Sequence, residues 1–283
     1  MPELPEVEIT RRQLTSLVCG RRIVKVSTTV PSYFFLTAPR TLRQKLLGRS
    51  FVTVKRVGKY LLAALDDGCS LLLHLGMTGQ LRIVSMADGE RPDAHVHLRI
   101  RFEDSDTELW FRDARKFGKV GWLAADASDQ RLDKLGIDAL RCTGEHLFRI
   151  LQTRRVPIKA ALLQQNVIAG VGNIYADEAL FLAGIAPMRV AQDLTQPELE
   201  RLAVTIQQVL TTAIACGGSS IRDFVHPSGK RGGYQAQRWV YGREGEPCKR
   251  CAAPIRRIIL AQRSSHYCAQ CQTGASTSRR RNG

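Results

Sequence analysis

No stretch of the sequence approaches the ~18 consecutive apolar residues that a membrane-spanning helix needs. The first residues also lack the hydrophobic stretch of a secretory signal peptide, and no repeat of fixed period is visible. The first two absences argue against a membrane protein. We therefore expect a cytoplasmic protein without membrane association.

Acidic side chains are scarce relative to basic ones. The chain has 26 Asp and Glu against 42 Lys and Arg, so its formal net charge is +16. Such an excess usually indicates a polyanionic partner, most often nucleic acid, and the alternative is a merely basic soluble protein. Basic residues occur along the whole chain, so the terminal SRRR alone does not explain the balance.

The length of 283 residues suits about two domains, and a hydrophobic content of 44% is enough for real cores. The first half predicts a helix over 3–18, a second helix over 39–47 and a series of short strands. This spacing indicates a sandwich or barrel rather than alternating βαβ units. The predicted strands are 22–27, 51–57, 60–65, 70–75, 95–102, 108–112 and 120–124.

The pattern changes after about residue 130, where helical periodicity replaces the short strands. The glycine-rich segment 216–235 is interpreted as a long loop, and such loops are often functional. A cysteine-bearing module and a disordered tail follow. The predicted helices are 134–140, 144–153, 158–165, 174–184 and 196–215.

Four of the eight cysteines form two CxxC pairs that are separated by 16 residues, Cys248/Cys251 and Cys268/Cys271. Such spacing lets two turns supply the four corners of a tetrahedral zinc site. Two disulfides are the alternative, but the sequence has no export signal. Four thiolates would fill the coordination sphere, so we predict one structural Zn²⁺ that does not activate water. The isolated cysteines are interpreted as buried thiols.

The segment between the two pairs, 255–267, predicts a β-hairpin with its turn near residues 263–265. Gln262 and Arg263 at an exposed tip could enter a groove or hold a phosphate. A solvated basic turn is the alternative, and the spacing alone does not decide between them.

The N-terminal string MPELPEVE allows two interpretations. Pro5 and Glu6 suit the first turn of a helix, where an acidic side chain favours the positive N-terminus. Alternatively, the small second residue lets an aminopeptidase remove Met1, which leaves Pro2 as a free secondary amine. The residues alone favour the first interpretation.

Other segments are ambiguous when taken singly. Asn173, in the glycine-rich turn before the helix 174–184, is predicted to be the N-cap, and exposed N–H groups there could bind a phosphate. The helix dipole is a sufficient explanation for Asp177 and Glu178. Lys59 resembles an ordinary turn lysine. Met77 and Phe117 could be apolar wedges on loops, although core packing is the usual explanation.

Six segments nevertheless occur together in a particular order: MPELPEVE, GKYLL (58–62), HLGMTGQL (74–81), DARKFG (113–118), AGVGNIYADEAL (169–180) and PCKRC with AQRSSHYCAQCQ (247–272). With them the chain resembles the bacterial formamidopyrimidine-DNA glycosylases over nearly its whole length. The resemblance implies an α+β multidomain fold. Its parts are an N-terminal helix and β-sandwich catalytic domain (1–133), a helix-two-turn-helix domain with a lesion-covering loop (134–236), a zinc-ribbon finger (237–272) and a disordered tail (273–283).

The resemblance also implies a bifunctional enzyme that excises oxidised purines, such as 8-oxoguanine and formamidopyrimidines, and then cuts the strand. Pro2 matches the nucleophile, Glu3 the acid/base, and Glu6 a further carboxylate of the active site. The expected partner is double-stranded DNA with oxidised purines or abasic sites, bound by a monomer associated with the nucleoid. The other implied residues are Lys59, Asn173 and Arg263 on phosphates, Met77, Arg115 and Phe117 in the vacated stack, and His95 on DNA.

Two other functions stay open at this point. The sister enzyme endonuclease VIII uses the same proline chemistry on oxidised pyrimidines, but PELPEV, Met77 and Phe117 favour the purine enzyme. A zinc-ribbon DNA-binding protein without catalysis would explain the charge and the cysteines and leave Pro2 and Glu3 unexplained. Departures from the family pattern at Ala114, Ala252 and Ala269 remove no reactive group.

Overall fold

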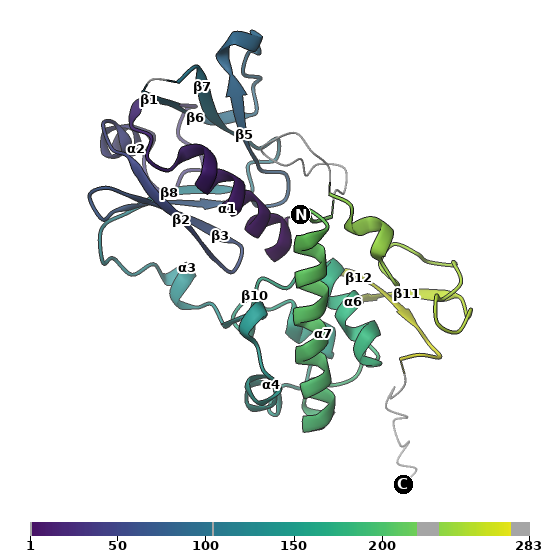
Figure 1. The fold of residues 1–283 in the computed structure, drawn as a ribbon. Coiled ribbons are helices and arrows are strands. Elements are labelled where there is room, and N and C mark those ends of the chain that lie inside the picture. Colours follow the sequence, from purple (N-terminus) through teal and green to yellow (C-terminus); the bar gives the residue numbers. More distant parts are fainter. Residues whose placement is uncertain (1, 104, 220–231, 273–283) are drawn as a thin grey trace. The chain divides into compact units, whose positions relative to one another are not determined.

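The computed structural model describes residues 2–103, 105–219 and 232–272 (Figure 1). The chain forms two compact units, Met1–Asp133 with Ala213–Gln235, and Lys134–Thr212 with Ala236–Gly283. The predicted disordered tail 273–283 and residues 220–231 of the predicted lesion-covering loop lie outside the described residues. No helix in the described ranges is long and apolar enough to cross a membrane.

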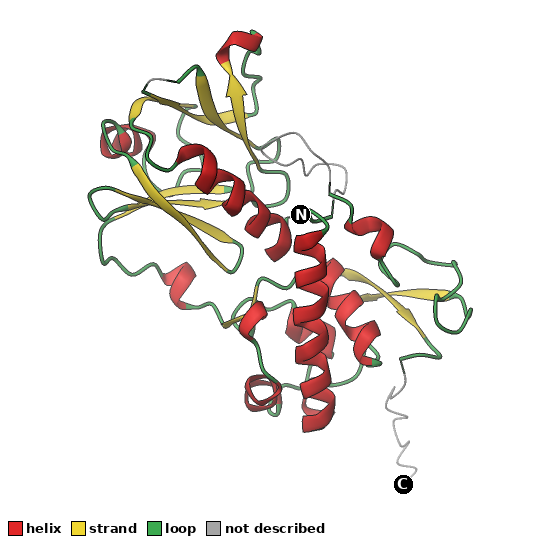
Figure 2. Ribbon diagram, in the orientation of Figure 1, coloured by secondary structure: helices red, strands yellow, loops and turns green. Residues whose placement is uncertain are grey.

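The first unit contains two antiparallel sheets of four strands each, preceded by helix α1 (Leu4–Val18) (Figure 2). Helix α2 (Pro39–Leu46) follows the first strand, and the short helices are η1 (Met86–Asp88) and α3 (Gln130–Asp133). One sheet has the order β2 (Phe51–Val57), β3 (Tyr60–Leu65), β4 (Ser70–His74), β8 (Lys119–Leu123). The other has the order β1 (Ile23–Thr28), β6 (Val96–Phe102), β7 (Thr107–Arg112), β5 (Gln80–Ser85).

One hydrophobic core joins the two sheets. Strand β3 buries every second residue, as expected for a strand with one face in a core, and β6 contributes from the other sheet. The rings of Phe51 and Phe102, one from each sheet, lie 6.2 Å apart. Helix α1 adds Val7, Leu14 and Val18. The predicted β-sandwich is therefore confirmed.

The second unit is mainly helical and ends in a two-stranded hairpin. Its longer elements are α4 (Gly144–Leu151), α5 (Ile158–Leu162), α6 (Asn173–Ala183), α7 (Gln196–Ala215), β11 (Ile255–Leu260) and β12 (Arg263–Cys268). Its short elements are β9 (Ile137–Asp138), η2 (Ala139–Arg141), β10 (Ile168–Ala169) and η3 (Ala191–Asp193), and η4 (Tyr234–Gln237) lies at the boundary between the units.

The helix predicted over 134–140 is wrong. Residues 137–138 form β9, which pairs in parallel with β10. Gly136 explains the difference, because a Cβ there would lie 2.4 Å from the carbonyl oxygen of Val167. The two backbones are therefore in direct contact at a point where a helix would separate them.

Helix α1 is attached to β2 by a cluster of charges around Glu8. Arg11, Arg12 and Arg56 lie 2.8, 2.9 and 3.2 Å from its carboxylate oxygens. Burial alone raises the pKa of Glu8, but the hydrogen bonds from Arg11 and Arg12 and the charge of Arg56 outweigh burial and lower the pKa to about 2. The cluster therefore stabilises the folded state while Glu8 is ionised.

We expect Glu8→Gln to reduce the free energy of unfolding at pH 7 by about 2–3 kcal/mol. The unfolded state binds more protons than the folded state as pH falls from 4.5 toward 2, so the contribution is complete above pH 4.5 and is lost below it. Urea midpoints at pH 7 measure the effect. Glu90→Gln is the matched control, because it removes only an exposed pair with Arg82 and should change stability by less than ~0.5 kcal/mol. Equal effects of the two variants would contradict this account of Glu8.

Candidate functional site

The N-terminal residues are part of the folded first unit. Pro2 is buried, and Glu3, which is 2% exposed, precedes α1 in an extended conformation as its N-cap. The Glu3 N–H donates a hydrogen bond of 2.8 Å to Oε2 of Glu6. Pro5 and Glu6 do occupy the first turn, so the simple helix-start interpretation of this string is correct as local structure. This interpretation does not exclude a chemical role for Pro2. Most chain ends fray, whereas Pro2 and Glu3 are buried and so have fixed surroundings.

The structure shows which contacts Glu6 makes. While Oε2 accepts from Glu3, Oε1 accepts the N–H of Ser219 at 2.8 Å. Gly218 makes this approach possible: it has a φ of +77°, and a Cβ there would lie 3.0 Å from the same oxygen. Glu6 therefore connects the backbone just after Pro2 to the start of the glycine-rich segment 216–235.

Lys59 is not an ordinary solvated turn lysine. It is 8% exposed, at the turn between β2 and β3. Burial, together with the charges of Lys59 and Lys119, lowers the pKa of nearby His74 to about 4, so this imidazole is neutral at pH 7. Nδ1 of His74 accepts the N–H of Gly76 at 3.2 Å. The turn thus holds a buried cation beside a neutral histidine.

Two loops of the first unit lie against each other, 75–79 with Met77 and 113–118 with Arg115 and Phe117. A Cβ on Gly76 would lie 2.4 Å from the nitrogen of Gly118, so the two backbones touch. Phe117 is 43% exposed and Arg115 is also exposed, with its guanidinium 4.6 Å from the Phe117 ring centroid. The core-packing alternative is therefore wrong for Phe117, and Met77 is half-buried.

His95 lies next to the second of these loops. It is exposed, and its N–H donates to Oδ1 of Asp93 at 3.0 Å. Its carbonyl accepts the N–H of Asp113 at 2.8 Å. The structure therefore brings four predicted residues together on connected loops: Met77, His95, Arg115 and Phe117.

In the second unit the prediction for Asn173 needs correction. The N-cap of α6 is Gly172, whose extended backbone (φ −133°, ψ −163°) precedes the helix, and Asn173 is already the first helical residue. Its side chain is half-buried, and Nδ2 lies 3.5 Å from the hydroxyl of Tyr241. The Asn173 side chain therefore contacts Tyr241 and does not cap the helix.

The dipole explanation for Glu178 and Asp177 is wrong, because both side chains are fully buried. Glu178 accepts three backbone N–H bonds, from Trp239, Val240 and Tyr241, at 2.7, 3.0 and 2.8 Å. Burial raises the pKa of Glu178, although these donors oppose the shift. Glu178 therefore fastens residues 239–241 to α6.

Asp177 fastens the hairpin to the same helix. Its Oδ1 lies 2.6 Å from Nζ of fully buried Lys159, and its Oδ2 accepts the N–H of His266 at 2.8 Å. Lys159 Nζ also donates to the carbonyl of Ser264 at 2.6 Å. The buried pair therefore holds β12 at Ser264, which follows exposed Arg263, and at His266.

The predicted hairpin is present, but its turn is not at 263–265. Ala261 and Gln262 form the turn, with left-handed φ values of 46° and 60°, and Leu260 pairs with Arg263. A two-residue turn with two left-handed residues matches the twist of the flanking strands. Arg263 therefore begins the second strand.

The four predicted cysteine ligands form one cluster, in which all sulfur atoms lie within 4.8 Å of one another. Two of the Sγ–Sγ distances are 3.8 Å (Cys248 to Cys271) and 3.4 Å (Cys251 to Cys268). A tetrahedron with Zn–S bonds of ~2.3 Å has edges of about 3.8 Å. The cluster fits one zinc ion with four thiolate ligands.

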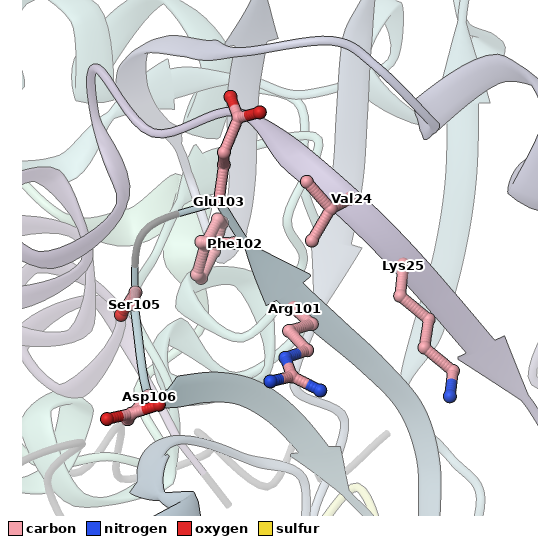
Figure 3. A pocket seen from close by; sticks show the side chains of 7 residues that line it. All are labelled: Val24, Lys25, Arg101, Phe102, Glu103, Ser105 and Asp106. Atoms are coloured by element: carbon pink, nitrogen blue, oxygen red, sulfur yellow. The ribbon is translucent and has the colours of Figure 1, made fainter.

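A surface pocket of about 620 Å³ lies at β1, the end of β6 and the residues that follow β6 (Figure 3). Its lining includes two basic side chains, Lys25 and Arg101, and two acidic ones, Glu103 and Asp106. These charges cancel, and none of the predicted site residues is part of the lining. The pocket is therefore separate from the residues that the sequence singles out.

Sequence reasoning missed Asp113, Lys159 and the contacts of Asp177 and Glu178. Asp113 is fully buried and is bonded to the loops that carry Met77, Arg115 and Phe117. Asp113, Asp177 and Glu178 lie inside the quoted motifs, which was their only signal, and Lys159 lies outside them. Most of the decisive contacts join segments distant in the chain.

Three family models match the chain: the formamidopyrimidine-DNA glycosylase N-terminal domain (1–120), the H2TH domain of the same enzymes (135–225) and a zinc finger found in FPG and IleRS (245–274). A formamidopyrimidine-DNA glycosylase of Desulfitobacterium hafniense is 43% identical over 276 residues, covering 96% of this chain and all of the relative. Among solved structures, Lactococcus lactis Fpg in complex with abasic-site DNA has a TM-score of 0.87 and 35% identity. The same protein with FAPY-dG DNA has a TM-score of 0.86 and 34% identity; both alignments cover 96% of this chain and all of the other.

Proposed function

Since the chain belongs to the formamidopyrimidine-DNA glycosylase family, we propose that it uses Pro2 to excise oxidised purines from duplex DNA and to cut the strand. It is a DNA glycosylase of base excision repair, with the abasic-site lyase activity typical of this family. The observation that carries the residue assignment is the N-terminus itself, where Pro2 and Glu3 are buried and the Glu3 backbone is bonded to Glu6.

The damaged base has to leave the stack before a side chain can reach its glycosidic carbon. We propose that Pro2, freed of Met1, then attacks C1′ of the sugar with its nitrogen lone pair. An ordinary α-amine has a pKa of about 7.7–8.0, so part of it is uncharged at neutral pH, although a cyclic secondary amine is more basic unless its site lowers the pKa. Formation of the C1′–N bond expels the base, and Glu3 protonates the ring oxygen as the sugar opens.

The resulting iminium ion explains strand cleavage without a redox cofactor. Its positive nitrogen draws electrons from C1′ and so acidifies the C2′ protons. Loss of one such proton expels the 3′ phosphate by β-elimination. A second elimination, δ, expels the 5′ phosphate, and hydrolysis of the iminium then returns the amine of Pro2.

The remaining residues are proposed to hold DNA. Lys59 in the first unit, and Asn173 and Arg263 in the second, would contact phosphates around the extruded nucleotide, where cations and amide donors are suited to phosphate oxygens. Lys59 and Arg263 also belong to the proposed catalytic set, because their phosphate contacts would hold the extruded nucleotide. The net charge of +16 would attract the DNA backbone without regard to sequence.

Met77, Arg115 and Phe117 are proposed to fill the vacated stack and to contact the orphan cytosine. The exposure of Phe117 and its contact with Arg115 support this role. Glu6 is proposed to support the active site through its two backbone contacts, and His95 to bind DNA beside the loops.

One structural zinc ion fits the four cysteines, and because thiolates occupy every ligand position it holds no reactive water. We also propose action as a monomer, associated with the nucleoid through DNA binding. The domain limits 1–133, 134–236 and 237–272 belong to the proposal as well, and the matched ranges 1–120, 135–225 and 245–274 support them.

Comparison of three duplex substrates tests this function. We expect release of 8-oxoguanine and of a formamidopyrimidine opposite cytosine to be at least about tenfold faster than release of thymine glycol, because a site built around one base's polar groups rejects another. The reverse preference would identify the endonuclease VIII activity. Tight binding without base release or cleavage of an abasic site would leave a noncatalytic zinc-ribbon protein.

A further inference from the structure

Asp113 follows β7 at the start of the loop 113–118, and its carboxylate is fully buried. Both carboxylate oxygens accept hydrogen bonds. Oδ1 receives the hydroxyl of Thr78 at 2.5 Å and the N–H of Arg115 at 3.2 Å, and Oδ2 receives the N–H of Gly118 at 2.7 Å. A buried carboxylate with three donors fixes each donor in place, because charge-assisted bonds are shorter and stronger than neutral ones.

These donors belong to the loops that carry the proposed stack-filling residues. Thr78 directly follows Met77, whereas the N–H groups of Arg115 and Gly118 lie on the two sides of Phe117. The backbone of Asp113 extends the same network: its N–H donates to the carbonyl of His95 at 2.8 Å. Asp113 therefore joins two loops that are 35 residues apart in the chain, together with the backbone contact at Gly76 and Gly118 and a bond of 3.3 Å from the Arg115 N–H to Oγ1 of Thr78.

The loop 113–118 would not hold this shape by itself. Lys116, between Arg115 and Phe117, has a left-handed φ of 57°, a conformation that L-residues adopt only when their surroundings impose it. Its N–H donates to the carbonyl of Asp113 at 3.3 Å, so the same residue closes the turn. In this conformation the guanidinium of Arg115 lies over the ring of Phe117.

We propose that Asp113 is a positioning residue that presents Met77, Arg115 and Phe117 as one rigid unit to the gap left by the extruded base. The inference rests on the proposed function, and it adds a determinant of opposite-base selectivity that does not itself touch DNA. A side chain that fixes both loops has to affect how Arg115 meets the orphan base, while the chemistry at Pro2 and Glu3 depends on other contacts.

The test uses Asp113→Asn and Thr78→Val in the full-length, zinc-loaded protein. Asp113→Asn keeps the size of the side chain but replaces one acceptor oxygen with a donor, so at least one of the three bonds is lost. Thr78→Val removes the hydroxyl, which donates to Oδ1 of Asp113 and accepts the N–H of Arg115 at 3.3 Å. It therefore weakens the connection between the two loops, while Asp113 keeps its own bonds to Arg115 and Gly118. Thr107→Val is the control, because it removes a hydroxyl bonded to Arg21 and Ser105 at the other end of β7.

Three rates are measured under single turnover: excision of 8-oxoguanine opposite cytosine, excision opposite adenine, and borohydride trapping on a preformed abasic site. We expect Asp113→Asn to slow excision opposite cytosine by about 10–100-fold, since displacement of a positioned group by about 1 Å can have effects of that size. The cytosine-to-adenine ratio should fall toward one and abasic-site trapping should stay within about threefold. Thr78→Val should lower the same ratio by a smaller factor, and Thr107→Val should not change it.

A cytosine-to-adenine ratio unchanged in Thr78→Val would overturn the proposal even if Asp113→Asn fails to fold. Equal loss of excision and of trapping in a folded Asp113→Asn variant would also overturn it, because a general structural defect predicts that result. Failure of the proposed function itself looks different: the unmodified protein would then neither excise the base nor form the trapped adduct.

Discussion

Replacing Pro2 with leucine should abolish base excision and strand cleavage. A bulky second residue keeps Met1 in place, so the chain's free amine moves one residue away from the buried position that Pro2 occupies. Removal of a nucleophile from a cooperating catalytic set typically reduces the rate by at least ~10³-fold, and we expect a loss of that size. Single-turnover release of 8-oxoguanine, with cleavage of the strand as a second readout, measures it.

Pro2→Gly is the matched variant. Glycine allows Met1 to be removed and keeps an α-amine at the same position, but without the ring, so we expect trapping that is slower by about tenfold rather than absent. Borohydride reduction of the complex with 8-oxoguanine opposite cytosine should give an adduct that peptide mapping places at residue 2. Buried Lys59 is the other amine of the first unit's site, and an adduct there would contradict the mechanism. So would an intact mass that shows retained methionine in a protein that cleaves damaged DNA.

Most strands of the sandwich were predictable because each is a short run rich in apolar residues, and turn residues separate several of these runs. The predicted limits 51–57 and 60–65 are those of β2 and β3. Strand β5 was not predicted, although its buried residues, Leu81 and Val84, have the same spacing as Phe51 and Val54 of β2. The mistaken helix over 134–140 had suitable composition, and only the contact between Gly136 and Val167 excludes it.

The metal site was predictable because the spacing of its two CxxC pairs is itself the signal, whereas the role of Pro2 is implied only by the family resemblance. The candidate site was not predictable where a residue acts through segments distant in the chain. Asp177 lies 89 residues from its partner His266, and Glu178 lies 61 residues from Trp239. At the start of a helix both acids have a sufficient local explanation, and only their complete burial shows that it is wrong. Asp113 illustrates the same limit, because its role depends on Thr78 in another loop.

Removal of zinc should abolish specific DNA binding, with an expected loss of affinity of at least about 100-fold. The hydrophobic cluster beneath the hairpin is small, and two of its five buried members, Cys248 and Cys268, are themselves predicted zinc ligands. Without the metal the contacts of Asp177 and Lys159 with β12 remain, but so few apolar side chains do not fold β11 and the cysteine turns, so the hairpin tip that carries Arg263 is no longer held in place. The sandwich core consists of residues from 7 to 120 and should survive, which near-UV circular dichroism and urea unfolding would show.

Arg263→Ala with zinc bound separates the side chain from its scaffold. Asp177 and Lys159 still hold β12 in this variant, so the hairpin keeps its position and one proposed phosphate contact is lost. We expect weaker binding to damaged and undamaged DNA alike, and a slope of log affinity against log salt that is reduced by about one. Metal analysis has to confirm that zinc is gone. If DNA binding is then undiminished, the hairpin needs no metal. If Arg263→Ala keeps the salt slope of the unmodified protein, Arg263 does not contact a phosphate. That result would not contradict the proposal that zinc holds the hairpin in place.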